Sequence, residues 1–411
     1  MYLIFIELNE INFDVVAEYI KSGESLPAFQ KLLTEGVLET FAEQEYELIE
    51  PWIQWASVHT GKSFSEHRIF RLGDIVNSPE VQFFERIESL GFKVGAISPM
   101  NARNSLKSPA YFIPDPWTVT PSDGSYLSES VSKAISQAVN DNAKAKLTIS
   151  SIFSLCIAML VLVSVRQVFK LAVYAIGTMG HPWRKAIFLD KLLYQVHKSL
   201  QKKHNPNFST LFLNAGAHIQ HHYFLNSKVL RKTAIANPDW YISEAEDPVL
   251  EVFKSYDEML KDLLGIERVN IIIATGLSQK PYDRVKYYYR LKEHAQFLYV
   301  IGIEFTSVEP RMTRDFLVTF DSDELALSAE KKFSSILVDG EYKLFGEIDN
   351  RGSELFVTLT YPNEITVQTS VNIANGAEKL AKHVVFVAIK NGMHQSKGFS
   401  YFSERIKQFA P

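Results

Sequence analysis

The sequence predicts an α/β protein with a mostly parallel central sheet and helices on both faces. Short apolar runs at residues 2–8, 93–98 and 269–274 alternate with helix-like segments, in the rhythm of parallel strand–helix–strand units. Polar or glycine residues follow these runs, for example Asn9-Glu10 and Thr275-Gly276. Open α/β sheets bind ligands at the carboxyl ends of their strands, so these positions are the first candidates for a site.

The composition is that of an ordinary soluble globular protein. The 411 residues suffice for one large α/β domain with insertions or for two domains, and the net charge of −4 argues against nucleic-acid binding. The single cysteine, Cys156, rules out an intramolecular disulfide and a cysteine-based zinc site. The N-terminus lacks a basic region and a cleavage site and is interpreted as the first strand. We therefore expect a cytoplasmic protein, with possible peripheral contact to a membrane.

The first third of the chain contains the stretch around which we expect the site to be organised, residues 50–74. Within it, Trp52, Trp55 and Val58 have helical spacing and Gly61 ends the turn. Before it, we expect one helix over residues 13–36 and a strand at 37–41. After it, we expect a helix over 80–90 and the strand 93–98.

Residues 147–165 contain no charged residue and must be weighed as a membrane span. Four serines weaken the run and Arg166 ends it. A single crossing would also place strands of one sheet on opposite sides of a membrane. We therefore expect an apolar helical insertion over about 147–177, either packed as a cap or lying in a membrane interface.

The second half supplies further strands and a small α+β part. A strand at 210–213 leads into a histidine-rich turn at 214–224, and an amphipathic helix covers 252–264. The basic, aromatic segment 282–290 is interpreted as a solvated helix face, with an anionic substrate or a lipid headgroup as the alternative partner. Strand, helix, strand and strand follow over 316–361, with a hairpin turn at 349–352, and 384–389 is expected to return to the central sheet. The predicted parts are a core at 1–146, the apolar insertion at 147–205, further core at 206–310, a small α+β insertion or cap at 311–372, and core with the last strand and a C-terminal helix at 373–411.

Several segments carry a family resemblance. HTGKSFSEHRIF at 59–70, AHIQHHYF at 217–224, ATG at 274–276 and GMHQSKG at 392–398 occur in the order of known motifs. The pattern resembles the alkaline phosphatase superfamily, in its phosphodiesterase and cofactor-independent phosphoglycerate mutase branch. The resemblance implies an alkaline phosphatase-like fold and chemistry on phosphate or sulfate esters.

The resemblance also implies that part of the usual active site is missing. The family's first aspartate falls on Asn9 and its threonine or serine nucleophile on Pro51. Two ligands from the Asp-His-Gly strand fall on Ala274 and Thr275. One metal of the usual pair is therefore not expected, and neither is the usual nucleophile.

The second metal of the family is normally held by an aspartate and two histidines. The aspartate falls on Ala217, whereas both histidines are retained as His221 and His394. Two histidines can hold a zinc-like ion if a third ligand joins them, leaving one position open for water. Candidate third ligands are Glu7, Glu10, Glu50, His218 and His222. We expect at most one divalent metal, zinc or manganese, with His221, His394 and Glu10 as its ligands.

Other side chains are candidates for catalysis or substrate binding. Glu50, Glu10 and His218 are candidate catalytic residues, and the candidates for substrate binding are Asn9, Thr60, Trp55, Asn214 and Thr275. Several have a plainer interpretation: Asn9 as a helix cap, Thr60 as part of a structural turn, Trp55 as a core residue, the two glutamates as solvated side chains and His218 as an exposed one.

Three functions remain open. The first is a divergent metal-dependent hydrolase or transferase of phosphate or sulfate esters, acting on a small or glycan-linked anionic substrate. The second is a non-catalytic relative that binds an anionic or glycan ligand or acts as a scaffold. The third is a membrane-surface enzyme acting on a lipid-linked substrate through residues 147–176. The sequence does not define the substrate or the oligomeric state.

Overall fold

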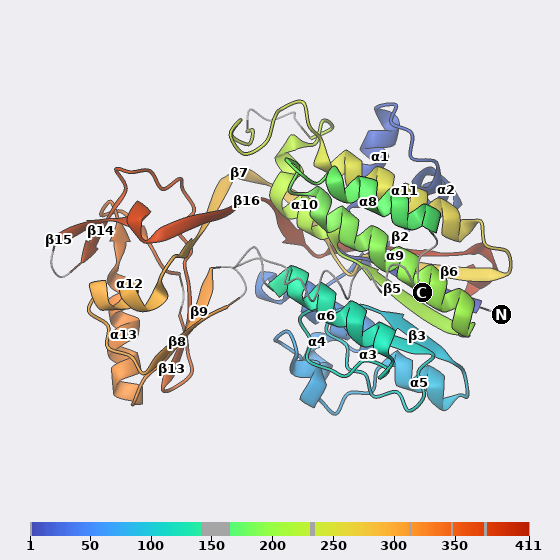
Figure 1. Cartoon of the computed structure of the whole chain (residues 1–411), viewed down its shortest axis with the longest axis horizontal. Coiled ribbons are helices and arrows are strands. Elements are labelled where there is room, and N and C mark those ends of the chain that lie inside the picture. The colour runs from blue at the N-terminus through green and yellow to red at the C-terminus, as the bar shows by residue number, and fades with distance from the viewer. Residues whose placement is uncertain are drawn as a thin grey trace. The chain divides into compact units, whose positions relative to one another are not determined.

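A computed structural model describes residues 2–140, 165–230, 235–311, 314–346, 348–373 and 376–410 (Figure 1). The chain divides into two compact units, Met1–Pro281 with Gly392–Pro411, and Tyr282–Asn391. The segment 311–372, expected as a small α+β insertion, belongs to the second unit. Most of the uncharged run at 147–165 lies outside the described residues.

The first unit is built on a seven-stranded sheet in the order β2-β17-β6-β1-β5-β3-β4. Neighbouring pairs among β6, β1, β5, β3 and β4 are parallel, and β17 is antiparallel to both β6 and β2. The predicted mostly parallel sheet is therefore confirmed. Its strands are β1 (Tyr2–Leu8), β2 (Leu38–Phe41), β3 (Val94–Ile97), β4 (Tyr111–Ile113), β5 (Phe208–Leu213), β6 (Val269–Ala274) and β17 (Lys397–Phe402).

Helices cover both faces of this sheet, as predicted. Alternate strand residues point to opposite faces, so Ile4 and Ile6 of β1 join one hydrophobic cluster and Phe5 joins another. The larger cluster also takes residues from α1 (Phe13–Lys21), α2 (Pro27–Glu35), α6 (Tyr126–Asn140), α8 (Val165–Ile176), α9 (Arg184–His204), α10 (Ala215–Tyr223) and α11 (Pro248–Leu264). The smaller cluster takes residues from α3 (Pro51–Thr60) and α5 (Phe83–Ser89), and the short helix α4 (Phe64–His67) follows α3.

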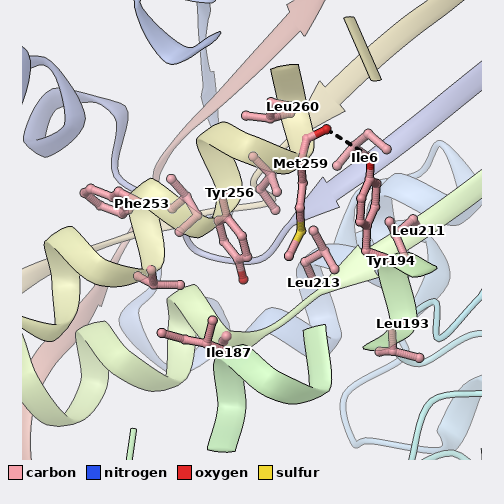
Figure 2. Packing of buried hydrophobic residues seen from close by; sticks show 14 of the residues in the cluster. Ile6, Ile187, Leu193, Tyr194, Leu211, Leu213, Phe253, Tyr256, Met259 and Leu260 are labelled. Carbon is pink, nitrogen blue, oxygen red and sulfur yellow. Dashed lines mark hydrogen bonds between the residues drawn. The ribbon is translucent and has the colours of Figure 1, made fainter. Parts of the chain in front are cut away.

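The larger cluster fixes α9 and α11 against the central strands. Figure 2 shows Ile6 of β1 and Leu213 of β5 among side chains of both helices. The Tyr194 hydroxyl of α9 donates a hydrogen bond to the Met259 carbonyl of α11 over 3.4 Å. This packing matters for the site, because α10 begins directly after β5 and contacts both α9 and α11.

Two predicted helical segments differ from the structure. The single helix expected at residues 13–36 is two helices, because Gly23 has a left-handed φ of 95° and Pro27 starts α2. A residue before proline is disfavoured in helical conformation, so Leu26 cannot continue a helix into Pro27. The histidine-rich turn expected at 214–224 is helical over Ala215–Tyr223, as α10.

Two segments near the boundary of the units were also predicted wrongly. Residues 282–290, interpreted as a helix face, belong to the strand β7 (Ser278–Leu291), in keeping with the strand preference of its consecutive tyrosines. Residues 384–389 do not return to the central sheet. They belong to β16 (Val384–Gln395), which pairs with β7 in a two-stranded sheet, and β17 is the strand that joins the central sheet.

The second unit is α+β and has its own hydrophobic core, formed around Phe316, Phe333 and Phe345. One four-stranded sheet has the order β11-β10-β14-β15 and another the order β12-β13-β9-β8. The predicted hairpin is present, with Asn350 paired to Leu355 across the turn. The elements are α12 (His294–Val300), β8 (Ser307–Pro310), β9 (Asp315–Thr319), α13 (Asp323–Ser335), β10 (Leu337–Val338), β11 (Tyr342–Lys343), β12 (Asp349–Asn350), β13 (Glu354–Thr358), β14 (Ser370–Ile373) and β15 (Gly376–Lys379).

Among the residues that the structure describes, none of the helices is both long enough and apolar enough to cross a membrane.

Candidate metal centre

Three central strands end next to one another and place polar residues at one edge of the sheet. The Asn9 N–H donates to the Leu213 carbonyl at the end of β5, and the Glu10 N–H donates to the Thr275 carbonyl after β6, each over 3.0 Å. The chain after β1 is therefore bonded to both neighbouring strands. This edge is the carboxyl end of the parallel strands, where open α/β sheets bind ligands.

Glu10 is held at this edge in a strained backbone conformation. Its φ is 60°, a left-handed value that is unfavourable for a residue other than glycine and is typical of functional sites. The side-chain amide of Gln220 donates to the Glu10 carbonyl over 2.8 Å, and that of Gln279 donates to Glu10 Oε2 over 2.5 Å. Asn9 Nδ2 donates to Glu10 Oε1 over 3.1 Å. Backbone and carboxylate are thus both fixed by neighbouring amides.

His221 and His394 meet this carboxylate. His221 is on α10 and His394 on β16, and the Nε2 atom of each lies 3.1 Å from Glu10 Oε2. The two Nε2 atoms lie 3.2 Å from each other. Three ligand atoms therefore form a nearly equilateral triangle. Within the described parts of the chain, this is the group of histidine and acidic residues close enough together to hold a metal ion.

The other nitrogen of each imidazole faces an oxygen atom outside the triangle. His221 Nδ1 lies 3.2 Å from the Gly392 carbonyl, and His394 Nδ1 lies 3.5 Å from Glu50 Oε2. A carbonyl can only accept, so the His221 contact places a proton on Nδ1 and turns Nε2 toward Glu10. Metal-binding histidines commonly have such a carbonyl or carboxylate behind the ring.

The dimensions of the triangle fit a tetrahedral ion. Zinc binds nitrogen and oxygen ligands at about 2.0–2.1 Å, so two ligands of a tetrahedral site lie roughly 3.3 Å apart. The observed separations of 3.1, 3.1 and 3.2 Å are close to that value. Two histidines and one glutamate are also a known ligand set of catalytic zinc, in which a fourth position is left for water or substrate. The residues present therefore fit a divalent metal.

The electrostatics of Glu10 suit the same role. The carboxylate is buried, which by itself raises its pKa, but the charges of His394 and His221 and their hydrogen bonds outweigh the burial and hold the pKa of Glu10 well below its ordinary value. Glu10 is therefore deprotonated at neutral pH. The His221 and Glu50 side chains are 18% and 32% exposed, so solvent reaches this side of the site.

A glycine makes the meeting of α10, β7 and β16 possible. A Cβ atom on Gly392 would lie 2.0 Å from Gln279 Oε1 and 2.7 Å from the Gln220 carbonyl. Only glycine lets β16 approach this closely and bring His394, two residues later, to Glu10. Gly392 is in the GMHQSKG segment, where the sequence alone did not indicate this close packing.

A buried carboxylate on another helix fixes the start of α10. Asp190 of α9 accepts hydrogen bonds from the Ala215 N–H over 2.8 Å and from the Tyr256 hydroxyl over 2.5 Å. The Tyr256 hydroxyl is in turn 2.9 Å from the Gly216 N–H. Asn214, the residue before the helix, makes no side-chain cap. Asp190 therefore caps the first turn of α10, although it is distant in the sequence. No local sequence signal could have indicated this role of Asp190.

The predicted substrate-binding residues have structural partners. The Trp55 indole N–H donates to Asn9 Oδ1 over 2.7 Å, and its ring is fully buried. Asn9 Nδ2 donates to Asn214 Oδ1 over 2.8 Å. The Thr60 hydroxyl donates to the Ala56 carbonyl within α3, and the Thr275 hydroxyl accepts the Phe399 N–H. These contacts support the edge of the sheet; of the five residues, Asn9 is bonded directly to the Glu10 carboxylate.

The remaining candidate ligands lie apart from the triangle. Glu7 points to the other face of the sheet, where its carboxylate is buried with His59 at 3.3 Å and accepts from the Thr210 hydroxyl. His218 is exposed on α10, beside His222, with 4.7 Å between ring centres.

A serine–histidine pair nearby does not form an activated nucleophile. Ser57 Oγ lies 2.9 Å from His67 Nε2. However, His67 Nδ1 accepts the Ile69 N–H over 2.9 Å, so the proton of a neutral ring must be on Nε2. His67 therefore donates to Ser57 and cannot take its proton.

No protein-family model and no curated protein sequence matches the chain. Among solved structures, phosphonoacetate hydrolase from Sinorhizobium meliloti 1021 in complex with phosphonoformate is similar, with 12% identity and a TM-score of 0.40 over 98% of this chain and 89% of that chain. Human ectonucleotide pyrophosphatase/phosphodiesterase 5 is similar with 10% identity and a TM-score of 0.37, over 98% and 87% of the two chains. At these values the likeness assigns no role to individual residues.

Proposed function

We propose that this chain is a divergent member of the alkaline phosphatase superfamily and acts as a hydrolase or transferase on phosphate or sulfate esters with one divalent metal. The motif order in the sequence supports the family. The observation that carries the activity is the triangle of Glu10 Oε2, His221 Nε2 and His394 Nε2. A carboxylate and two neutral imidazoles around a divalent ion leave a net positive charge, which suits an anionic substrate.

The metal would be held by Glu10, His221 and His394, with zinc or manganese as the candidates. When bound, it would supply positive charge that offsets the charge on the nonbridging oxygens of the ester and favours ionisation of water at neutral pH. Glu10 is buried, deprotonated and fixed by amides from Asn9 and Gln279. Its role in this proposal is therefore to bind the metal and not to transfer a proton.

Glu50 acts in this proposal through His394. Its carboxylate lies at the Nδ1 side of the ring, whereas the triangle lies at the Nε2 side. It therefore orients the imidazole and strengthens Nε2 as a ligand. Pro51 offers no nucleophilic atom where the family resemblance places the nucleophile, so water is the attacking group that we propose.

The test is the metal content of protein purified without added metal or a histidine tag, followed by a screen of phosphate and sulfate esters. We expect about one zinc or manganese ion per chain, as for other sites with three protein ligands. His221→Ala should lose both the metal and turnover, whereas His222→Ala, one residue later on α10, should keep both. Turnover that persists in His221→Ala would contradict the assignment.

A non-catalytic role is the second candidate, and a specific observation favours it. Pro51 begins α3 with no reactive side chain, and the Thr275 hydroxyl is already bonded to the Phe399 N–H. In this case the edge of the sheet would bind an anionic or glycan ligand without turnover. Protein that contains no metal, and whose melting temperature no metal changes, would support this binding function over the enzyme.

A further inference from the structure

The helix α8 carries exposed apolar side chains along one face. Phe169, Val173 and Ile176 are 70%, 54% and 69% exposed, and their spacing of four and three residues places them on the same side of the helix. Met179, just after the helix, is 79% exposed. Single exposed apolar residues are ordinary on a protein surface, but a continuous apolar stripe indicates an interaction site.

The opposite face of α8 is already occupied by the protein. Leu171 is 4% exposed and belongs to the larger hydrophobic cluster, with Val168 packed against it. The Tyr174 hydroxyl donates to Glu251 Oε1 of α11 over 3.0 Å. The helix is therefore apolar on both sides, and the described residues of the first unit bury only one of them. Such a helix needs a second apolar environment.

The surrounding sequence identifies the chemistry of the partner. Residues 142–189 contain no aspartate or glutamate, although the whole chain has a net charge of −4. The same segment holds the basic residues Lys144, Lys146, Arg166, Lys170, Arg184 and Lys185, and an uncharged run occupies 147–165. Of these, Arg184 is paired with Glu251 of α11 over 2.8 Å. Apolar and basic residues without acidic ones are the composition that binds an anionic lipid surface.

We propose that the Phe169–Val173–Ile176 face of α8 docks on a phospholipid bilayer that carries anionic headgroups. The helix would lie in the interface rather than cross it, because its 12 residues span roughly 18 Å against a hydrocarbon core of about 30 Å. A second copy of the chain is a poorer partner, since a symmetric contact would bring two basic segments together. The bilayer receives both the apolar stripe and the basic charge.

The experiment is flotation of the intact protein with vesicles of phosphatidylcholine alone and of phosphatidylcholine mixed with phosphatidylglycerol. The test variant is Phe169→Ser/Val173→Ser/Ile176→Ser. The matched control is Leu90→Ser/Val119→Ser/Val367→Ser, because these residues are 73%, 89% and 76% exposed at scattered positions. All six side chains are largely exposed, so both variants should keep the melting temperature of the wild type.

We expect the wild type and the control to float with the anionic vesicles, and the α8 variant to bind them at least about tenfold less, because it lacks three apolar side chains at the surface. Equal flotation of wild type and α8 variant would overturn the proposal, and so would a wild type that floats with neither vesicle. Equal binding to both vesicle types would overturn the choice of anionic lipid. If the wild type is a dimer that binds no vesicles and the α8 variant is a monomer, the apolar face of α8 binds a second copy of the chain instead.

Discussion

The Nε2 atoms of His221 and His394 lie 3.2 Å apart, although one residue is on a helix after β5 and the other near the end of the long strand β16. Both atoms also lie 3.1 Å from the same oxygen of Glu10. The Gly392 carbonyl accepts a hydrogen bond from Nδ1–H of His221, so Nε2 faces the triangle. Ligand atoms that converge in this way can bind a positive ion.

Metal binding should stabilise the fold. Zinc or manganese at about 100 times its dissociation constant should add about 2.7 kcal/mol to the free energy of unfolding, because the unfolded chain does not assemble the three ligands. The measurement is thermal unfolding of metal-stripped protein with and without added metal. Glu10→Gln should lose this stabilisation. The control is His222→Ala, because Glu7, the other nearby glutamate, is buried and its replacement could itself destabilise the fold. A full metal response in Glu10→Gln would exclude Glu10 as a ligand.

Gly392→Ala should disrupt the centre without touching a ligand. Its Cβ would lie 2.0 Å from Gln279 Oε1 and 2.7 Å from a backbone carbonyl. Overpacking of this kind costs about 1–3 kcal/mol, and here it should also displace His394 and lower metal affinity. The control is Gly265→Ala, where the new Cβ meets atoms at 3.3 Å or more and φ is −83°. Chemical denaturation and metal titration give the two readouts. Unchanged metal affinity would show that β16 can shift without moving His394.

Glu50→Gln should weaken the centre without removing it. The carboxylate is 3.5 Å from His394 Nδ1, behind the ring. Loss of such a partner typically lowers metal affinity or activity about 10- to 100-fold. Competition with a chelator measures the affinity, and Glu47→Gln, at an exposed residue of the same segment, is the control. Complete loss of metal would instead make Glu50 a direct ligand.

The stability of the fold should depend on the ionisation of Asp190. Burial raises its pKa to about 6, above the value of about 3.9 in an unfolded chain. The fold therefore favours the protonated carboxyl, and this contribution, fully present below about pH 4, is lost as the pH rises through about 6. Asp190→Asn cannot ionise. The free energy of unfolding of Asp190→Asn relative to the wild type should therefore increase by about 2 kcal/mol as the pH rises from about 4.5 to 7.5.

Urea unfolding of both proteins across this pH range checks the prediction for Asp190. The control is Asp239→Asn, because Asp239 is exposed and lies outside the helices and strands. The difference between the control and the wild type should be nearly constant over the range. A constant difference for Asp190→Asn as well would mean that the buried carboxylate does not titrate in this window.

Local sequence patterns were enough to predict the layered α/β fold and most of the strands of its central sheet. Continuous apolar runs are a strong local signal, so β1 and β6 have the predicted bounds and β3 and β5 differ from them by one or two residues. The helix predicted over 282–290 is wrong, although consecutive tyrosines favour a strand. The strand also depends on pairing with β16, about a hundred residues away, and a local sequence pattern does not show such pairing. Glu10, His221 and His394 could be named because each follows a strand or a resembling motif.

Long-range packing brings these three residues together, and no local pattern predicts it. The amides of Gln220 and Gln279 hold Glu10, and Asp190 holds the start of α10. Gly392 leaves room for β16. None of these residues has a local pattern that distinguishes it from an ordinary surface glutamine, aspartate or glycine. Their roles arise from close packing between distant segments, and a linear sequence records the segments but not the distances between them.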